Sequence, residues 1–312
     1  MRYKISIVAF AAVLCSATAG HAASILESAD VFAVLGSSTV TNTGSSNVTG
    51  DLGLASPGVS VTGFSAPPAN TLVEGPESTG LISDAPGLVT GTIRIRGAIA
   101  EQARTDALAA WTGLQNMTAT GNLSGQVLGD GGTIPTLTSG VYHFDSTAQL
   151  TGALTLDAEG NNNAFWVFQV ESSLTTASAS SVTLINPGLN NGIFWQIGES
   201  ATLGTTTSFR GNIIADQSIT LTTGADIACG RAIALTAAVT MDTNDITANC
   251  GVGTGGTSSG FVGGVEFDNS GKVVPLPPQE GPVVPEPASM LLFGLGGVAT
   301  TFIKRKTKSV MA

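Results

Sequence analysis

The stretch SITLTTGADIACGRAIALTA, Ser218–Ala237, decides the fold, because the stretch before it, SATLGTTTSFRGNIIADQ at Ser200–Gln217, has nearly the same pattern. Further outward, the pattern returns in LTGALTL (Leu150–Leu156), SLTTASASSVTLI (Ser173–Ile185) and AVTMDTNDIT (Ala238–Thr247). A weak repeat of roughly 18–27 residues, rich in Thr and almost without charge, is typical of stacked β-rungs. Stacking places equivalent Thr side chains in rows, so the sequence predicts a β-solenoid with a Thr-lined surface.

One segment, Ile93–Met117, has a helical pattern instead. Its apolar residues recur at steps of three or four and form one stripe: Ile95, Ile99, Ala103, Ala107, Ala110 and Leu114. Two strand segments, Ala164–Phe168 and Ile193–Ile197, are apolar on both faces, whereas a strand with one exposed face alternates apolar and polar residues. We therefore predict that the helix covers the outer face of these strands.

Both ends of the chain carry targeting patterns. Residues 1–22 combine basic residues, an apolar run and small residues, which predicts a secretory signal peptide cut after Ala22. The other end has Pro285, Glu286 and Pro287, then an apolar run over 288–303 and a basic cluster. This order resembles the PEP-CTERM sorting signal of Gram-negative bacteria. The resemblance implies processing by an exosortase and release from the cell or attachment in an exopolysaccharide matrix.

These patterns divide the chain into a signal peptide (1–22), a solenoid domain (23–250), a flexible Gly/Ser/Pro-rich linker (251–284) and the sorting signal (285–312) with a short transmembrane segment. The alternative for the last segment is an ordinary C-terminal membrane anchor. Residues 24–284 carry six basic and 21 acidic groups, a net charge of −15, so the domain is not expected to bind nucleic acid.

Two cysteines remain after the predicted cleavage, Cys229 and Cys250, 21 positions apart. This separation is about one repeat, and neighbouring rungs lie about 4.8 Å apart, within the Cα range of a disulfide. An exported protein permits such a bond, so we predict a disulfide between the two cysteines. Two free thiols are the alternative.

Catalysis and metal binding have little support in the sequence. His143 is the one histidine left after cleavage and cannot form a metal cluster or a catalytic triad by itself. Asp145, Asp157, Asp242 and Asp245 are interpreted as solvated turn residues. We expect neither a cofactor nor a metal, and no enzymatic activity.

Several segments together resemble the secreted ice-binding proteins of bacteria, fungi and algae that have a discontinuous β-solenoid. The matching segments are Phe32–Gly44, Val48–Gly53, Gly140–Tyr142, Leu150–Asp157, Phe194–Gly198, Ser200–Thr205 and Val239–Asn244. The resemblance implies a right-handed, triangular solenoid with the helix along one side, an N-terminal segment that closes one end, and a flat face that binds ice. One departure is Asp226, which stands where the family often keeps a small or hydroxyl residue.

The Thr pattern supports ice binding independently. Thr is stiff at χ1 and presents a methyl and a hydroxyl group, so a row of Thr can hold water in an ordered layer without charges that impose their own hydration. The alternative is that Thr simply suits exposed strands. We predict an ice-binding face made of Thr151, Ala153, Thr176, Ser178, Thr205, Thr207, Thr223 and Ala225. The competing function is adhesion to exopolysaccharide at the cell surface or in the matrix, on the same fold. Either function is expected outside the cell or at its surface, after transient anchoring in the inner membrane.

Overall fold

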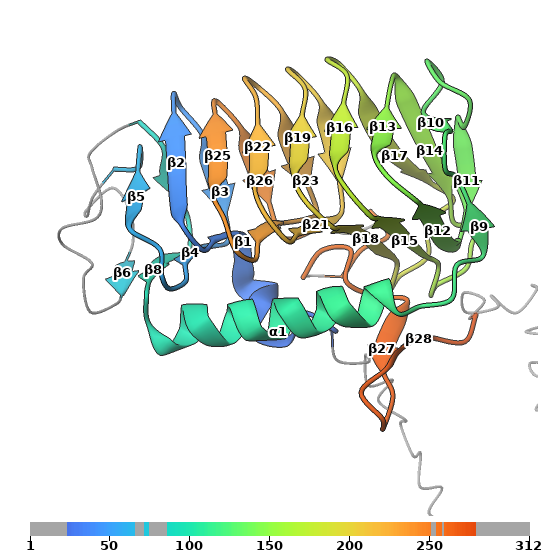
Figure 1. The fold of residues 1–312 in the computed structure, drawn as a ribbon, viewed down its shortest axis with the longest axis horizontal. Coiled ribbons are helices and arrows are strands. Elements are labelled where there is room, and N and C mark those ends of the chain that lie inside the picture. The colour runs from blue at the N-terminus through green and yellow to red at the C-terminus, as the bar shows by residue number, and fades with distance from the viewer. Residues whose placement is uncertain (1–23, 66–71, 75–85, 251–253, 258, 279–312) are drawn as a thin grey trace, which may run out of the picture.

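The computed structural model describes residues 24–65, 72–74, 86–250, 254–257 and 259–278. Three parallel sheets run along a prism of stacked turns, and one helix lies along its side (Figure 1). The predicted signal peptide and sorting signal lie outside the described residues. Within the part that the structure describes, no helix is both long and apolar enough to span a lipid bilayer.

The three sheets are named A, B and C here. Sheet A has ten strands, in the spatial order β6 (Leu72–Glu74), β8 (Thr92–Ile95), β4 (Asp51–Leu54), β1 (Phe32–Gly36), β24 (Ala232–Ala234), β21 (Asn212–Ala215), β18 (Gly192–Ile197), β15 (Phe165–Val170), β12 (Gly140–Phe144) and β9 (Gly121–Asn122). Sheet B has eight: β10 (Val127–Leu128), β13 (Ala148–Leu150), β16 (Leu174–Thr176), β19 (Ala201–Leu203), β22 (Ile219–Leu221), β25 (Val239–Asp242), β2 (Thr39–Thr43) and β5 (Ser60–Thr62).

Sheet C also has eight strands: β11 (Thr136–Thr138), β14 (Ala153–Asp157), β17 (Ser181–Ile185), β20 (Ser208–Arg210), β23 (Asp226–Ala228), β26 (Asp245–Thr247), β3 (Asn47–Thr49) and β7 (Leu88–Val89). All strand pairs within the three sheets are parallel among the described residues. The predicted β-solenoid is confirmed.

The N-terminal segment does not begin the stack. Strands β1, β2 and β3 pair with β24, β25 and β26, which are almost 200 residues away in the chain, so the first strands continue the last repeat. The chain must therefore return from the β8 end of the stack to the β9 end before the repeats can begin. The helix α1 (Ala98–Gln115) makes most of this return, since its 18 residues span about 27 Å.

The helix is shorter than the sequence pattern predicts. The prediction began the helix at Ile93, but Thr92–Ile95 is strand β8, and Ile95 points into the solenoid core. Ile99, predicted in the buried stripe, is 47% exposed. The buried face of α1 is instead made mostly of small residues: Ala100, Ala103, Ala107, Ala110, Gly113 and Leu114.

The helix covers the outer face of sheet A, as predicted. A second apolar cluster joins Ala107 and Leu114 of α1 to Val167 of β15 and Phe194 of β18. The side-chain amide of Gln169 donates hydrogen bonds to the carbonyls of Leu114 and Met117, both at 2.8 Å, and so satisfies part of the helix C-terminus. The central strands of sheet A, such as β18 and β21, are therefore buried on both faces, while sheets B and C each have an outer face that the helix does not cover.

The segment predicted as a flexible linker contains packed structure, so that prediction is wrong for the described residues. Strands β27 (Val265–Phe267) and β28 (Val273–Pro275) form an antiparallel hairpin. Val265 and Val273 are buried in the same apolar cluster as α1. A Cβ at Gly113 would lie 2.4 Å from a methyl of Val273, so glycine is needed there for the helix and hairpin to approach. The apolar residues of this Gly-rich stretch are too few to form a period that would have predicted the packing.

A disulfide joins Cys229 and Cys250, with their Cα atoms 4.7 Å apart. Cys229 follows β23 and Cys250 follows β26, and these strands are neighbours in sheet C. The bond therefore links two adjacent turns of the solenoid near the end of the C-terminal repeat.

Candidate functional site

The outer face of sheet B carries an unbroken row of threonines. Pairing in register aligns Thr175 with Thr202, Thr202 with Thr220, Thr220 with Thr240, Thr240 with Thr41, and Thr41 with Thr62. The result is a row of six consecutive Thr, one from each of β16, β19, β22, β25, β2 and β5, which we call the Thr ladder. Gln149 of β13 continues the row beyond Thr175.

The alternation of each strand turns these threonines outward. In β16, β19 and β22 the residues on either side of the central Thr are buried, while the Thr itself is exposed or half-buried. The flanking residues, such as Leu203 and Ile219, belong to the solenoid core. Because that core and the parallel ladder fix the backbone, the Thr side chains are held at the rung spacing of about 4.8 Å.

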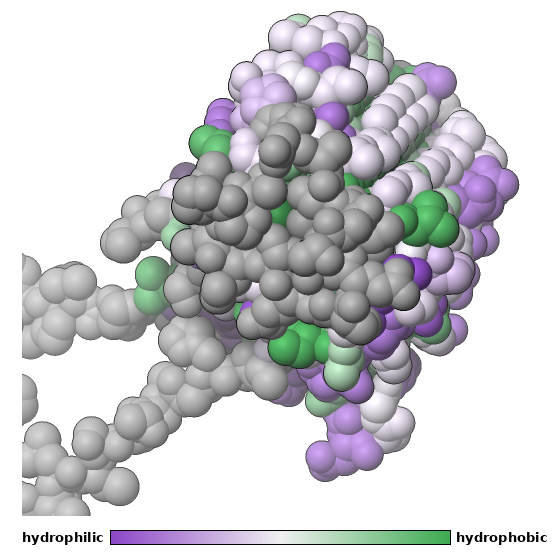
Figure 2. Space-filling model, turned by 90° about the vertical axis from the view of Figure 1, so that its left-hand side faces the viewer, coloured by the Kyte–Doolittle hydropathy of each residue, from purple (hydrophilic) through white to green (hydrophobic). Residues whose placement is uncertain are grey.

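A second uncharged row lies beside the Thr ladder, two residues earlier in each rung. Its members are small, and all are half-buried: Ser173, Ser200, Ser218, Ala238, Thr39 and Ser60. The hydroxyls of Ser200 and Ser218 lie 3.0 Å apart, and Thr39 is in register with Ser60. Figure 2 shows pale, near-neutral rows running away from the viewer on the flank where sheet B lies. The two rows together form a flat surface without an ionisable group.

Sheet C has a different outer face on the same backbone geometry. One of its rows runs through Ser208, Asp226, Asp245 and Asn47, and the neighbouring row contains Arg210 between Thr183 and Ala228. Burial raises the pKa of Asp226; the hydrogen bond from the backbone N–H of Asp245 lowers it, and repulsion from the Asp245 carboxylate raises it further. Charges thus interrupt every long row of hydroxyl groups on this face. Asp226 does not lie on the face that carries the Thr ladder.

The residues predicted from the sequence lie elsewhere, at the corner between sheets B and C. Thr151, Ser178, Thr205 and Thr223 are in the turns that follow β13, β16, β19 and β22, and Ala153 is the first residue of β14. Thr205 and Thr223 are exposed, and the hydroxyl of Thr223 donates to the carboxylate of Asp242. Ser178, Thr205 and Thr223 flank the Thr ladder, whereas Thr151 and Ala153 lie at the adjoining rung of β13. Their contact with a ligand remains a prediction.

Three of the predicted residues are buried, so their proposed role in surface binding is wrong. Thr176, Thr207 and Ala225 are 3%, 1% and 0% exposed. The hydroxyls of Thr176 and Thr207 lie 2.8 Å apart and form a buried hydrogen bond inside the corner. Thr175, the neighbour of Thr176, is the exposed one. Since side chains alternate along a strand, an error of one residue in the assumed position exchanges the inner and outer faces.

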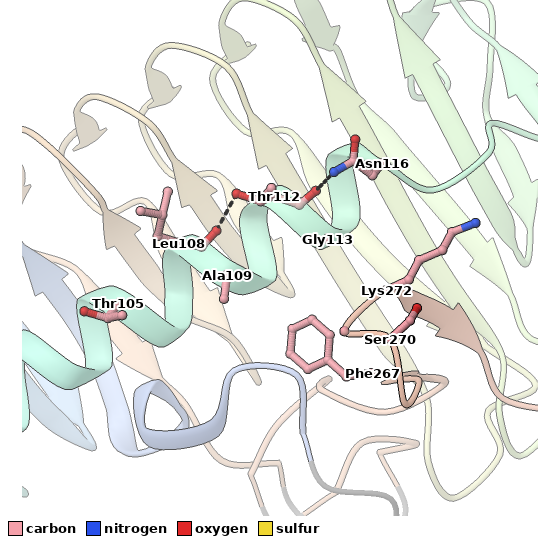
Figure 3. A pocket seen from close by; sticks show the side chains of 10 residues that line it. Thr105, Leu108, Ala109, Thr112, Gly113, Asn116, Phe267, Ser270 and Lys272 are labelled. Atoms are coloured by element: carbon pink, nitrogen blue, oxygen red, sulfur yellow. Dashed lines mark hydrogen bonds between the residues drawn. The ribbon is translucent and has the colours of Figure 1, made fainter.

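A groove beside helix α1 is the second candidate for a binding site. It has a volume of about 500 Å³ and lies between α1 and the β27–β28 hairpin, with Leu108 and Thr112 of the helix and Phe267 and Lys272 of the hairpin among its lining residues (Figure 3). Its walls are mostly small or apolar, and the dashed lines in Figure 3 are hydrogen bonds within the helix. The groove therefore offers shape and little recognition chemistry.

The side chains considered for metal binding and catalysis, and two of the tryptophans, are arranged as follows. Among the described residues, no three His, Cys, Asp or Glu side chains are grouped as a metal site would require. His143 pairs with Asp145 at 3.0 Å on an exposed edge. Trp166 and Trp195 are fully buried, and Trp195 stacks on Phe168 inside the solenoid with ring centroids 3.8 Å apart. These two indoles are part of the core and not of a surface.

The fold and this face define a class: β-solenoids with one face covered by a helix and a flat, uncharged hydroxyl-rich face left open. The chain belongs to the ice-binding-like family, which it matches over residues 34–247. Residues 283–306 match the PEP-CTERM protein-sorting motif. The family resemblance predicted from the sequence is confirmed.

Individual relatives agree with this assignment. The chain is 44% identical over 303 residues to the ice-binding protein of Nostoc sp. (strain HG1), covering 97% of this chain and 94% of the relative. It is similar to the crystal structure of an ice binding protein from an Antarctic biological consortium (TM-score 0.60, 40% identity, 71% of this chain and 89% of that one). The ice-binding protein of the Antarctic ascomycete Antarctomyces psychrotrophicus is also similar (TM-score 0.59, 36% identity, 71% and 96%).

Proposed function

We propose that this protein binds ice through the outer face of sheet B and inhibits ice recrystallisation without any enzymatic activity. The observation that carries the proposal is the Thr ladder: six threonines in consecutive, in-register rungs beside a second uncharged row. The names of the relatives reported above support the same function.

The physical basis is a rigid, weakly polar array. Each Thr methyl and hydroxyl makes only a weak contact, but the rungs repeat at about 4.8 Å, close to a lattice repeat of ice. Because the strands and the β-branched side chains are already ordered, little conformational entropy is lost on binding. Many such contacts acting together hold the protein on a growing crystal far more strongly than one contact would. A charged side chain within the array would keep its own hydration shell and disturb this match.

We further propose that the protein is exported and sorted. The signal peptide predicted at 1–22 would direct secretion, and the PEP-CTERM match supports cleavage by an exosortase at the C-terminal segment, which contains the motif Pro285-Glu286-Pro287. Anchoring through 288–303 would be transient, before release or attachment outside the cell. Intact-mass measurement of the protein from its producing cells tests this: both terminal segments should be missing.

The alternative, adhesion to exopolysaccharide, predicts a different surface. Sugar-binding faces commonly use exposed aromatic rings, and Trp166 and Trp195 are buried in the core. The uncharged Thr ladder also offers no charge for an ionic polysaccharide. Ice is therefore the better-supported ligand for sheet B.

A recrystallisation assay tests the proposal. Residues 24–278, which include the packed hairpin, should stop the coarsening of ice grains and shape single crystals at low concentration. A thermally denatured sample of the same protein should do neither. If folded protein leaves ice growth unchanged at every practical concentration, ice binding is wrong, and binding to the producer's exopolysaccharide becomes the next measurement.

A further inference from the structure

The Thr ladder crosses a seam between two distant parts of the chain. Thr41 and Thr62 come from the N-terminal segment, whereas Thr175, Thr202, Thr220 and Thr240 come from the repeats. At the seam, Thr41 is in register with Thr240, 199 residues away, and donates a hydrogen bond to its hydroxyl at 3.4 Å. Elsewhere among the repeats, one turn of the chain leads directly to the next rung. At the seam no such short connection exists, so the register there depends on side-chain contacts.

Within sheet A, apolar pairing alone specifies this register weakly. In sheet A the seam is formed by β1 and β24, where Val34 is opposite Ala232 and Leu35 is opposite Ile233. Every residue of these two strands is buried, because one side faces the core and the other faces the helix layer. A strand with one exposed face would expose its apolar set if it slipped by a residue, but these strands lack that alternation.

The buried guanidinium of Arg231 makes register-specific contacts that the apolar strands lack. Arg231, which directly precedes β24, is 0% exposed. Its Nε and Nη2 donate to the backbone carbonyl of Asp30, the Nε contact being 3.1 Å, and Nη1 donates to Oδ1 of Asn212 at 2.8 Å. Nη2 also donates to the carbonyl of Ser259 at 2.6 Å. A single side chain therefore connects the N-terminal segment, the preceding rung and the C-terminal loop.

Burial disfavours the charged form of the Arg231 side chain. Burial lowers the pKa of Arg231 to about 10, against the opposing effect of the Asp30 carboxylate 3.9 Å away, so the guanidinium stays protonated at neutral pH. Burial also raises the pKa of Asp30, more than Arg231 and the Ser24 hydroxyl lower it. Buried ion pairs of this kind are often less stabilising than apolar replacements, and their best-attested use is to specify register.

We propose that Arg231 is a positioning residue for the binding face: it locks the N-terminal segment in register, so that Thr41 and Thr62 extend the Thr ladder from four rungs to six. The surface that contacts ice is then a composite of two chain segments. The claim that the extended ladder contacts ice rests on the proposed function. The claim that Arg231 sets the register of the N-terminal segment can be measured without ice.

The structural test compares hydrogen exchange in the full chain and in Arg231→Met. Backbone amides of β1 and β2 should lose protection in the variant, while those of β16, β19 and β22 keep theirs. Arg231→Lys, which keeps the charge but reaches fewer acceptors, should fall between the two proteins. The Lys variant also keeps the test possible if Arg231→Met does not fold. Uniform loss of protection in all rungs, or none anywhere, would overturn the proposal, because Arg231 would then be an ordinary core residue or dispensable.

The functional test measures recrystallisation inhibition by the same proteins. Arg231→Met should need roughly tenfold more protein for the same inhibition, since contacts in a multivalent array reinforce one another. Thr43 and Asp242 are in register across the seam, so a disulfide between cysteines at these two positions would fix the register. Adding Thr43→Cys and Asp242→Cys to Arg231→Met and oxidising the protein should restore inhibition. Either cysteine alone should not. If β1 and β2 lose protection but inhibition is unchanged, the N-terminal rungs are not part of the face. If wild type does not bind ice, the exchange result still decides whether Arg231 sets the seam.

Discussion

The outer faces of sheets B and C have the same rung spacing, the same strand direction and the same number of strands, eight each. Sheet B presents six aligned threonines and a second row without an ionisable group, whereas sheet C places Arg210, Asp226 and Asp245 among its hydroxyl groups. The backbone therefore supplies a lattice of positions to both faces, and the outward residues alone decide which face can organise water. Threonine content by itself does not distinguish them, because sheet C also aligns Thr136, Thr155 and Thr183.

The largest expected effect comes from breaking the flatness of sheet B. Thr202→Tyr should abolish recrystallisation inhibition, since one bulky ring in the middle of the Thr ladder holds the rigid face away from the crystal. The matched control is Thr247→Tyr, at an outward position of sheet C between Ala228 and Thr49. An exposed strand accepts Tyr, so both variants should keep the wild-type melting temperature. The comparison fails if the two substitutions reduce activity equally.

Removing the disulfide should separate stability from binding. The bond closes a separation of 21 residues beside sheet C, so Cys229→Ser/Cys250→Ser should cost about 3 kcal/mol of unfolding free energy by the chain-entropy estimate. Inhibition measured near the freezing point should remain, because the Thr ladder keeps its backbone. Denaturant unfolding and the ice assay on the same preparations give both values. Loss of inhibition in a double variant that is still folded would show that the sheet C edge supports the face.

A smaller change tests the hydroxyl groups of the ladder. Thr220→Val preserves the shape and the outward methyl but removes one hydroxyl from the centre of the row. We expect a severalfold loss of inhibition with stability unchanged within about 0.5 kcal/mol, the usual range for surface substitutions. Ser208→Ala on sheet C is the control and should leave inhibition unchanged. A fully active Thr220→Val would mean that the methyl groups alone make the contact.

The smallest effect is expected at Asp226. Its pKa is raised in the folded protein, mainly by burial, so its ionised form is disfavoured there, and the protein gains stability as pH falls through that raised pKa. Asp226→Asn keeps an oxygen that can accept the 2.7 Å hydrogen bond from the backbone N–H of Asp245. The variant should therefore be slightly more stable than wild type at neutral pH, and the difference should shrink in acid. Its ice activity, and that of Asp226→Thr, should equal wild type, because Asp226 lies off the Thr ladder.

The sequence predicted the elements that depend on local pattern. The repeat in Ser200–Ala237 predicted stacked rungs, and the doubly apolar segments Ala164–Phe168 and Ile193–Ile197 predicted a covered sheet. The helical periodicity also located α1, but its start was wrong because Ile93 and Ile95 fit a helical stripe and a strand equally well. The buried residues of the hairpin, such as Val265 and Val273, are too few and too widely spaced within Gly-rich sequence to produce a recognisable period.

The sequence by itself determined the solenoid, the uncharged Thr-rich character of its repeats and the separation that brings Cys229 to Cys250. The tertiary structure decided which hydroxyls face outward. In the pair Thr175-Thr176 both residues look alike in the sequence, and only the register of the rung turns one to solvent and the other into the corner. It also decided that Thr41 and Thr62 join threonines from the far end of the chain, a pairing held through Arg231. Side-chain direction has a period of two residues and strand pairing is non-local, so neither can be obtained from composition or repeat spacing.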